Sequence, residues 1–254
     1  MLLRAEFRKL FPYRTVWVIL ALYVLLLAGF VSVGGGVTIN GKQLGNALYD
    51  FPTLWPRLAY VASYFNLLLG ILFIILITDE FQFRTFRQQI IDGSSPVGLV
   101  QGKLTVSGLL ALFGMVAVLG VGLFFGFTRA PKTLSHAPET IGAVLLYGIQ
   151  ALGYLAVAGT LGFLIRKSGP AILSFMLYAW VVEPLIRFVT PDQLDRYFPA
   201  KVFDSLTPTP GREMINTITG SSNALLPIEA VPLALAYIAL FWFLSYLLLR
   251  NRDL

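Results

Sequence analysis

The sequence contains no cysteine, one histidine and few charged residues. Without cysteine, disulfide bonds, thiol catalysis and thiolate metal sites are excluded. The single histidine, His136, leaves little room for metal chemistry. Charged residues make up 13% of the chain and hydrophobic residues 57%, against about 25% and about 45–50% in soluble domains. This composition indicates a membrane protein, and we expect no cofactor and no metal.

The sequence also lacks the motifs of nucleotide-binding and hydrolytic sites. GLVQGKL, Gly98 to Leu104, comes nearest to a P-loop, but Val97 replaces the first glycine of G-x-x-x-x-G-K-[ST] and Leu104 replaces the hydroxyl residue. Lys103 is better explained as an interfacial anchor. No HExxH or GxSxG motif is present, which disfavours an intramembrane enzyme. No basic stripe with interleaved aromatics occurs, so we expect no binding of nucleic acid.

Several runs of about 20 mostly apolar residues are each long enough to cross a bilayer. Short polar pieces separate most of them, so we predict one all-α transmembrane domain over residues 1–254 with six spans. A long outer loop connects the last two spans. The predicted spans are approximately 15–33, 58–78, 104–127, 141–165, 171–189 and 231–249.

Lysine and arginine are distributed unevenly among the loops. An even number of spans places both termini on one side, and short loops rich in these residues stay in the cytoplasm. The loops on the side of the termini are shorter and more basic than the others, so we expect both termini to be cytoplasmic. Their basic residues are Arg4, Arg8, Lys9, Arg14, Arg84, Arg87, Lys103, Arg166, Lys167, Arg250 and Arg252.

Apolar and basic residues are interleaved at helical spacing before the first span. This pattern predicts a short amphipathic helix on the inner membrane surface, ended by Pro12. An ordinary basic flank without a helix of its own is the alternative. The apolar residues are Leu3, Phe7, Leu10 and Phe11, and the basic ones are Arg4, Arg8 and Lys9.

Ionisable residues are scarce within the predicted spans. Glu183 is the main one, and Arg187 follows four residues later on the same helical face, which predicts an ion pair near the outer end of the fifth span. A substrate contact is the alternative. An ion-coupled carrier usually needs acidic groups deeper in the membrane, so the scarcity of buried charge argues that the energy for transport comes from elsewhere.

Glycines are frequent in the third and fourth spans. Gly122 and Gly126 form a GxxxG motif, which predicts close packing against a neighbouring helix because glycine lets two backbones approach. A sliding seam that opens a pathway is the alternative reading of these glycines.

The largest predicted cytoplasmic loop, Asp79 to Lys103, carries an amphipathic helix of its own. Phe83, Phe86 and Ile90 recur at helical spacing, which predicts one apolar face.

This helix has a predicted end, and the next helix has a predicted start. Gly93 is placed to end the first, and Ser95 with Pro96 to begin the second as N-cap and first residue. The alternative, a solvated loop with interfacial aromatics, would not need both caps. The chain is therefore expected to leave the second span, form a short helix along the inner face, turn and enter the third span.

The residues of this loop resemble a known family. Glu80 closes the second span, Thr85 and Arg87 follow, and Gly102 with Lys103 open the third. In this order they resemble the corresponding loop of ABC-2 type permeases, the membrane subunits of a class of ATP-binding-cassette exporters. The stretch EFQFRTFRQQIIDG is similar to members common in Bacteroidetes. Two positions depart from the usual pattern: Arg84 stands in place of a glycine, and Pro96 in place of a basic residue.

The resemblance implies a bacterial exporter subunit in the cytoplasmic membrane, with no ATP site of its own. Its implied partners are two copies of an ABC-type ATPase subunit, a second permease copy or homologue, and membrane lipids. The loop helix would be the coupling helix that docks on the ATPase, through Glu80, Phe83, Arg84, Thr85, Phe86, Arg87, Gln88 and Ile90. The alternatives are an assembly factor or enzyme without an ATPase partner, and an ion-coupled secondary carrier.

Overall fold

The computed structural model describes residues 12–34, 38–39, 42–43, 49–91, 93, 95–210 and 224–250. Over these residues the chain is almost entirely helical, and six helical segments are long and apolar enough to cross a membrane. The chain is therefore a multi-pass membrane protein. The predicted amphipathic helix at residues 3–11 lies outside the described residues. The six segments are Arg14–Gly34 (α2), Leu54–Gln82 (α3), Pro96–Arg129 (α5), Gly142–Ile165 (α6), Ser168–Val189 (α7, η2 and α8) and Pro227–Arg250 (α12).

Two of these helices are longer than the apolar runs that predict them. α3 and α5 both continue into their polar flanks, because a helix ends where a cap stops it and not where the apolar residues end. The start of α5 confirms the predicted cap. The Ser95 hydroxyl accepts a hydrogen bond from the Gly98 N–H at 3.1 Å, and Pro96 occupies the first turn.

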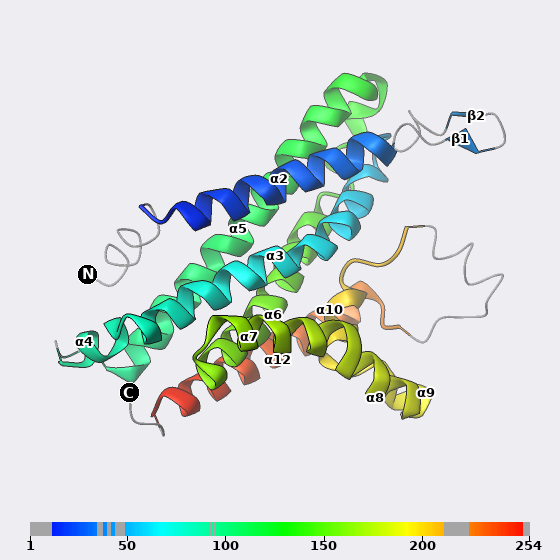
Figure 1. The fold of residues 1–254 in the computed structure, drawn as a ribbon. Helices are drawn as coiled ribbons and strands as arrows, with labels where there is room; N and C mark the ends of the chain where they lie inside the picture. The colour runs from blue at the N-terminus through cyan, green and yellow to red at the C-terminus, as the bar shows by residue number, and fades with distance from the viewer. Residues whose placement is uncertain are drawn as a thin grey trace.

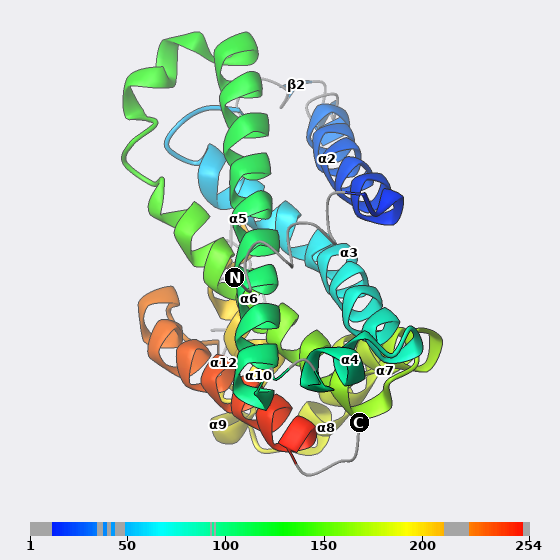
Figure 2. The same cartoon turned by 90° about the vertical axis from the view of Figure 1, so that its left-hand side faces the viewer.

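α6 lies at the centre of the bundle and contacts α3, α5, α7 and α12 (Figure 1). α5 is the longest helix and runs along the whole bundle beside α6 (Figure 2). α2 lies on the outside, against α3 and α5. The start of α2, the short helix α4 (Thr85–Ile91) and the end of α12 lie at one end of the bundle, which we call the α4 end (Figure 1).

The fifth segment is divided into three parts. α7 (Ser168–Leu177) is followed by one π-helical turn, η2 (Tyr178–Val182), and then by α8 (Glu183–Val189). Such π-turns inside α-helices are frequent at functional sites.

The connections opposite the α4 end contain short elements of their own. Two-residue strands, β1 (Thr38–Ile39) and β2 (Lys42–Gln43), pair in antiparallel fashion after α2, and the 3₁₀-helix η1 (Pro131–His136) follows α5. The predicted long loop after the fifth span holds α9 (Asp192–Asp195) and α10 (Pro199–Ser205). α10 packs against α6 and α12, so this part of the loop belongs to the bundle.

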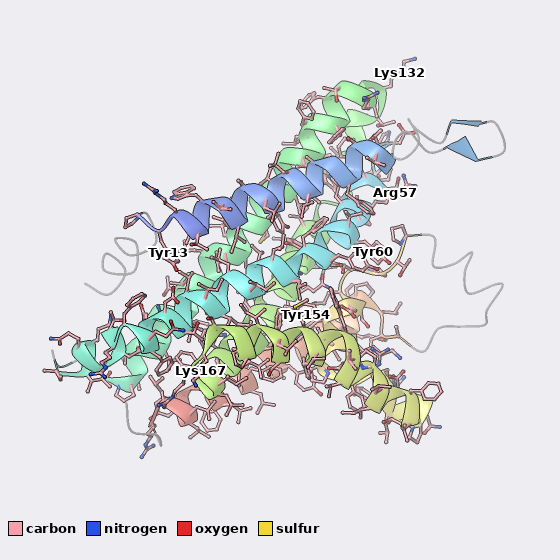
Figure 3. The ribbon with its side chains drawn as sticks, viewed as in Figure 1. Tyr13, Arg57, Tyr60, Lys132, Tyr154 and Lys167 are labelled. Atoms are coloured by element: carbon pink, nitrogen blue, oxygen red, sulfur yellow. The ribbon has the colours of Figure 1, made fainter. Side chains whose placement is uncertain are left out.

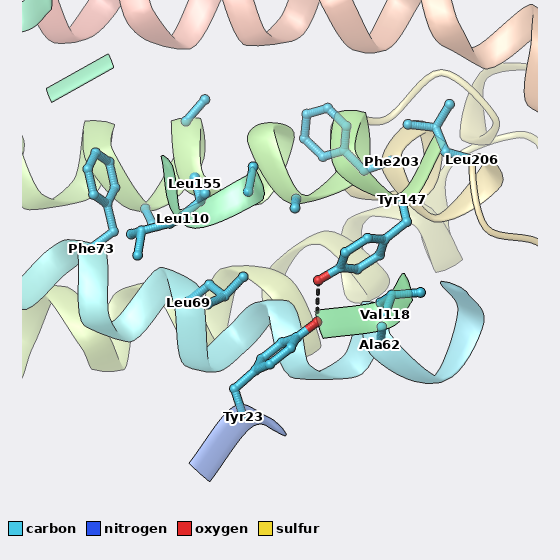
Figure 4. Packing of buried hydrophobic residues seen from close by; sticks show 14 of the residues in the cluster. Tyr23, Ala62, Leu69, Phe73, Leu110, Val118, Tyr147, Leu155, Phe203 and Leu206 are labelled. Atoms are coloured by element: carbon cyan, nitrogen blue, oxygen red, sulfur yellow. Dashed lines mark hydrogen bonds between the residues drawn. The ribbon is translucent and has the colours of Figure 1, made fainter. Parts of the chain in front are cut away.

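A chain of hydrogen bonds crosses the apolar core. Figure 4 shows its link between Tyr23 and Tyr147. The Tyr23 and Tyr147 hydroxyls lie 2.5 Å apart, and the Tyr147 O–H donates to Asn66 Oδ1 at 2.9 Å. All three side chains are buried. Because a buried polar group without a partner is costly, this chain ties α2, α3 and α6 together in one arrangement.

The predicted close packing of the GxxxG motif is confirmed. A Cβ atom on Gly122 would lie 2.7 Å from Leu58 Cδ1 and closer still to the Trp55 ring, and one on Gly126 would lie 2.6 Å from the Phe51 ring. Both glycines therefore let α5 approach the start of α3 closely.

Gly122→Ala is expected to destabilise the protein by about 1–3 kcal/mol, because the added methyl group forces the Trp55 and Leu58 side chains aside. Gly120→Ala is the matched control on the same helix, since a Cβ atom there has no heavy atom within 4 Å. Thermal unfolding in detergent measures both variants. Equal melting temperatures for the two would contradict the packing of α5 on α3.

Candidate functional site

The chain makes a tight turn between α3 and α4. Arg84 adopts a left-handed backbone conformation with φ of 56°, which is uncommon for a residue other than glycine. The Thr85 hydroxyl donates to the Glu80 carbonyl at 3.1 Å and supports the turn. Gly93, with φ of 89°, ends α4 as predicted, and its N–H donates to the Ile90 carbonyl at 2.9 Å. A short helix thus lies between the second and third spans, at the α4 end.

The apolar face that the sequence predicts for docking is only partly exposed, because one of its residues points into the bundle. Phe86 is only 1% exposed, and its ring centroid lies 4.7 Å from that of Phe81 and 6.0 Å from that of Phe163. Phe83, by contrast, is 75% exposed and Ile91 is 70% exposed. The assignment of Phe86 to a docking face is therefore corrected: it belongs to the core of the bundle.

The remaining predicted residues of the helix differ in exposure. Ile90 is partly buried against the core, whereas Arg84 and Gln88 are exposed. The side chain of Arg87 lies outside what the structure describes. Phe83 and Ile91 are thus the apolar side chains that the α4 region leaves on its surface.

Glu80 and Lys103 form an ion pair between α3 and α5, with 2.9 Å between the Lys103 ammonium and Glu80 Oε1. Both side chains are buried, and the ammonium also lies 5.8 Å from the centre of the Phe86 ring. Lys103 is therefore not an interfacial anchor, which corrects the prediction. The two motif residues stand at opposite ends of the predicted loop, and the fold brings them together beneath α4.

Two contacts that the sequence does not indicate involve the residues on either side of Glu80, Asp79 and Phe81. The Arg166 guanidinium lies 4.9 Å from the centre of the Phe81 ring, at the end of α6. The Tyr13 hydroxyl donates to Asp79 Oδ2 at 2.5 Å and joins the start of α2 to α3. This hydrogen bond, together with burial, raises the pKa of the Tyr13 hydroxyl. Tyr13 therefore remains a donor at physiological pH.

A cavity of about 560 Å³ opens beside α4. Its walls come from the end of α3, from α4 and from the α6–α7 junction, so a molecule bound there would touch all three. The lining residues are Glu80, Phe81, Gln82, Arg84, Phe86, Ile165, Arg166 and Lys167.

The predicted ion pair of Glu183 and Arg187 is replaced by other contacts. Glu183 is buried, and its carboxylate accepts hydrogen bonds from the Tyr178 hydroxyl at 2.6 Å and from the N–H groups of Ala200 and Lys201 at 3.0 and 3.1 Å. The carboxylate thus caps the first turn of α10 and holds it against the fifth span.

Arg187 instead binds Asp195 of α9, with 2.7 Å between Nε and Oδ1, and the Lys201 ammonium binds the other oxygen of Asp195. Burial alone would raise the pKa of the Asp195 carboxyl, but its bonds to Lys201 and Arg187 outweigh burial and hold the pKa below its ordinary value. A carboxylate of this kind contributes stability above its unfolded pKa of about 3.9, and this stability is lost as the pH falls through the folded value.

No family model and no curated protein sequence matches the chain. Within the described ranges, no three His, Asp or Glu side chains are grouped so that they could hold a metal ion.

Proposed function

We propose that the chain is the permease subunit of an ABC-2 type exporter, driven by a separate ATPase subunit. One observation carries the proposal: α4 lies outside the spans, Phe83 just before it and Ile91 at its end are exposed, and it rests on a buried ion pair that connects α3 to α5. Exposed apolar side chains in a charged surrounding suit a protein partner. The order Glu80, α4, Lys103 also matches the loop that the sequence resembles.

The contacts beneath α4 give a route by which a push from a partner reaches the membrane. Phe86 is wedged between Phe81 and Phe163, and the Glu80–Lys103 ion pair joins the two spans that flank α4. A displacement of α4 would therefore move the ends of α3 and α5 together as rigid bodies. Two such permeases, each on one ATPase subunit, would open and close a path between them when ATP brings the ATPases together.

Basic residues support a cytoplasmic placement of the α4 end in a bacterial inner membrane. Tyr13 and Lys167 lie at this end, whereas Arg57 and Lys132 lie at the opposite one (Figure 3). Among the described residues, most basic side chains in or next to the short connections lie at the α4 end. By the positive-inside rule, this distribution favours a cytoplasmic position of the α4 end. Both termini would then face the ATPase side. These basic residues are Arg14, Arg84, Lys103, Arg166, Lys167 and Arg250.

Purification of the natively expressed protein in mild detergent tests the proposal. We expect an ATPase with a P-loop to co-purify in a ratio of about one to each permease, because each α4 region would seat one ATPase subunit. Quantitative mass spectrometry of the eluted complex measures this ratio. Recovery of the intact permease without any such ATPase would support the alternative of an assembly factor or an enzyme.

A further inference from the structure

A second cavity lies in the half of the bundle away from α4, between α3, α6, η2 and α10. Its volume of about 430 Å³ is in the range of small-molecule sites, which span about 300–1,000 Å³. Five aromatic side chains line it: Tyr60, Tyr64, Tyr154, Phe175 and Trp180. Tyr60 and Tyr154 come from α3 and α6 (Figure 3). Trp180 lies on the π-helical turn, so the irregular part of the fifth span forms one wall.

Asp204 supplies the negative charge of this cavity. Its Oδ1 accepts hydrogen bonds from the Tyr154 hydroxyl at 2.7 Å and from Gln150 Nε2 at 3.4 Å. The side chain lines the cavity and is exposed there. The surrounding protein desolvates the carboxyl and so raises the pKa of Asp204, and the hydrogen bond from Tyr154 opposes part of that rise.

The other charged groups near Asp204 already have partners. Arg187 and Lys201 also line the cavity, but both bind Asp195. Glu183 is held by Tyr178 and by backbone N–H groups.

The group thus holds two cations, Arg187 and Lys201, and three carboxylates, Asp195, Glu183 and Asp204. Among the described residues, Asp204 is the one of these carboxylates that has neither a salt-bridge partner nor a backbone donor. The excess negative charge of the site is therefore located on Asp204, and it is open to a ligand.

Asn66 is another polar residue that lines the same cavity. Its side chain is 1% exposed, and its Oδ1 accepts the hydrogen bond from Tyr147. Its Nδ2, however, has no hydrogen-bond acceptor within the described part of the chain. Leaving a buried donor without a partner is unfavourable, because the donor has lost its hydrogen bonds to water. A ligand that carries an acceptor would remove this cost.

We propose that this cavity binds an organic cation that also carries a hydrogen-bond acceptor. The cationic group would lie at the Asp204 carboxylate, between the faces of the aromatic side chains, where both the charge and the ring quadrupoles attract it. The acceptor would receive the Asn66 Nδ2 hydrogen. That such a cation is the exported substrate rests on the proposed function, but the binding of the cation does not.

Acetylcholine has both groups and serves as the probe, in equilibrium dialysis against the purified full-length protein without ATP or ATPase. Asp204→Asn keeps an oxygen for Tyr154 but removes the charge, and we expect it to weaken binding at least about tenfold. Glu139→Gln, which removes an exposed carboxylate of the connection between α5 and α6, is the matched control and should bind as the parent does.

Two isosteres of the probe separate the contributions of its groups. 3,3-Dimethylbutyl acetate lacks the charge and should not compete, whereas pentyltrimethylammonium lacks the acceptor and should compete several-fold more weakly than acetylcholine. Unchanged binding to the Asp204→Asn variant, or equal competition by the neutral isostere or by benzoate, would overturn the proposal. Because no ATPase is present, these outcomes are independent of whether the protein is an ABC permease.

Discussion

Lys103→Met is expected to lower the free energy of unfolding by about 3–5 kcal/mol, because it removes one partner of a buried ion pair. The Lys103 ammonium lies 2.9 Å from the Glu80 carboxylate, and both side chains are buried. Without the ammonium, the negative charge of Glu80 stays buried while its ion pair with Lys103 is gone. Denaturant unfolding of the purified protein in detergent measures the loss.

A double-mutant cycle shows whether this loss comes from the ion pair. Glu80→Gln together with Lys103→Met should be more stable than the sum of the two single changes predicts, by at least about 1 kcal/mol, because the buried charge is removed with its partner. Lys132→Met, at an exposed position opposite the α4 end, should change stability by less than about 0.5 kcal/mol. Strict additivity of Glu80→Gln and Lys103→Met would contradict the pairing.

Phe83→Asp combined with Ile91→Asp is expected to abolish association with the ATPase while the permease stays folded. Both side chains are more than two-thirds exposed in the isolated chain, and burying such a side chain in a partner contributes about 1.5–3 kcal/mol. Their combined loss corresponds to more than a hundredfold weaker binding. Co-purification of the ATPase with the variant, at equal permease yield, measures the effect.

Two further variants make this experiment specific. Leu194→Asp with Ile228→Asp also places two acids at exposed apolar positions, but away from α4, and should leave ATPase association unchanged. Phe86→Asp should instead unfold the α4 end, because it puts a charge into the core beside Phe81 and Phe163. Full recovery of the ATPase with the Phe83→Asp, Ile91→Asp variant would show that these residues are not part of the interface.

Local signals in the sequence predict much of the fold. The six spans follow from long apolar runs, and the ends of the helices around α4 follow from Gly93, Ser95 and Pro96. Each of these features depends on residues close together in the chain. Gly122 and Gly126 belong to the same class, because a small-residue spacing on one helix is enough to indicate a close approach.

Contacts between segments that are distant in the chain could not be predicted from the sequence. Helical spacing groups Phe83 with Phe86, but only the packing against Phe163 of α6 decides that Phe86 turns inward. Similarly, the spacing of Glu183 and Arg187 predicts an ion pair, but the Glu183 carboxylate binds N–H groups of α10 instead. The position of α10 beside the fifth span cannot be predicted from the periodicity of the sequence. Asp204 could not be recognised for the same reason, since its hydrogen-bond partners come from α6.

The most direct test of whether the protein is an ABC permease is site-specific cross-linking. The sequence contains no cysteine, so one introduced cysteine gives a unique attachment point. Phe83→Cys places it beside α4, and Lys132→Cys places it at an exposed position at the opposite end. A photoactivatable cross-linker on each variant is illuminated in native membranes, and the products are identified by mass spectrometry. We expect a cross-link to a P-loop ATPase from position 83 and none from position 132. No ATPase adduct from position 83, with the label confirmed on the protein, would contradict the proposed function.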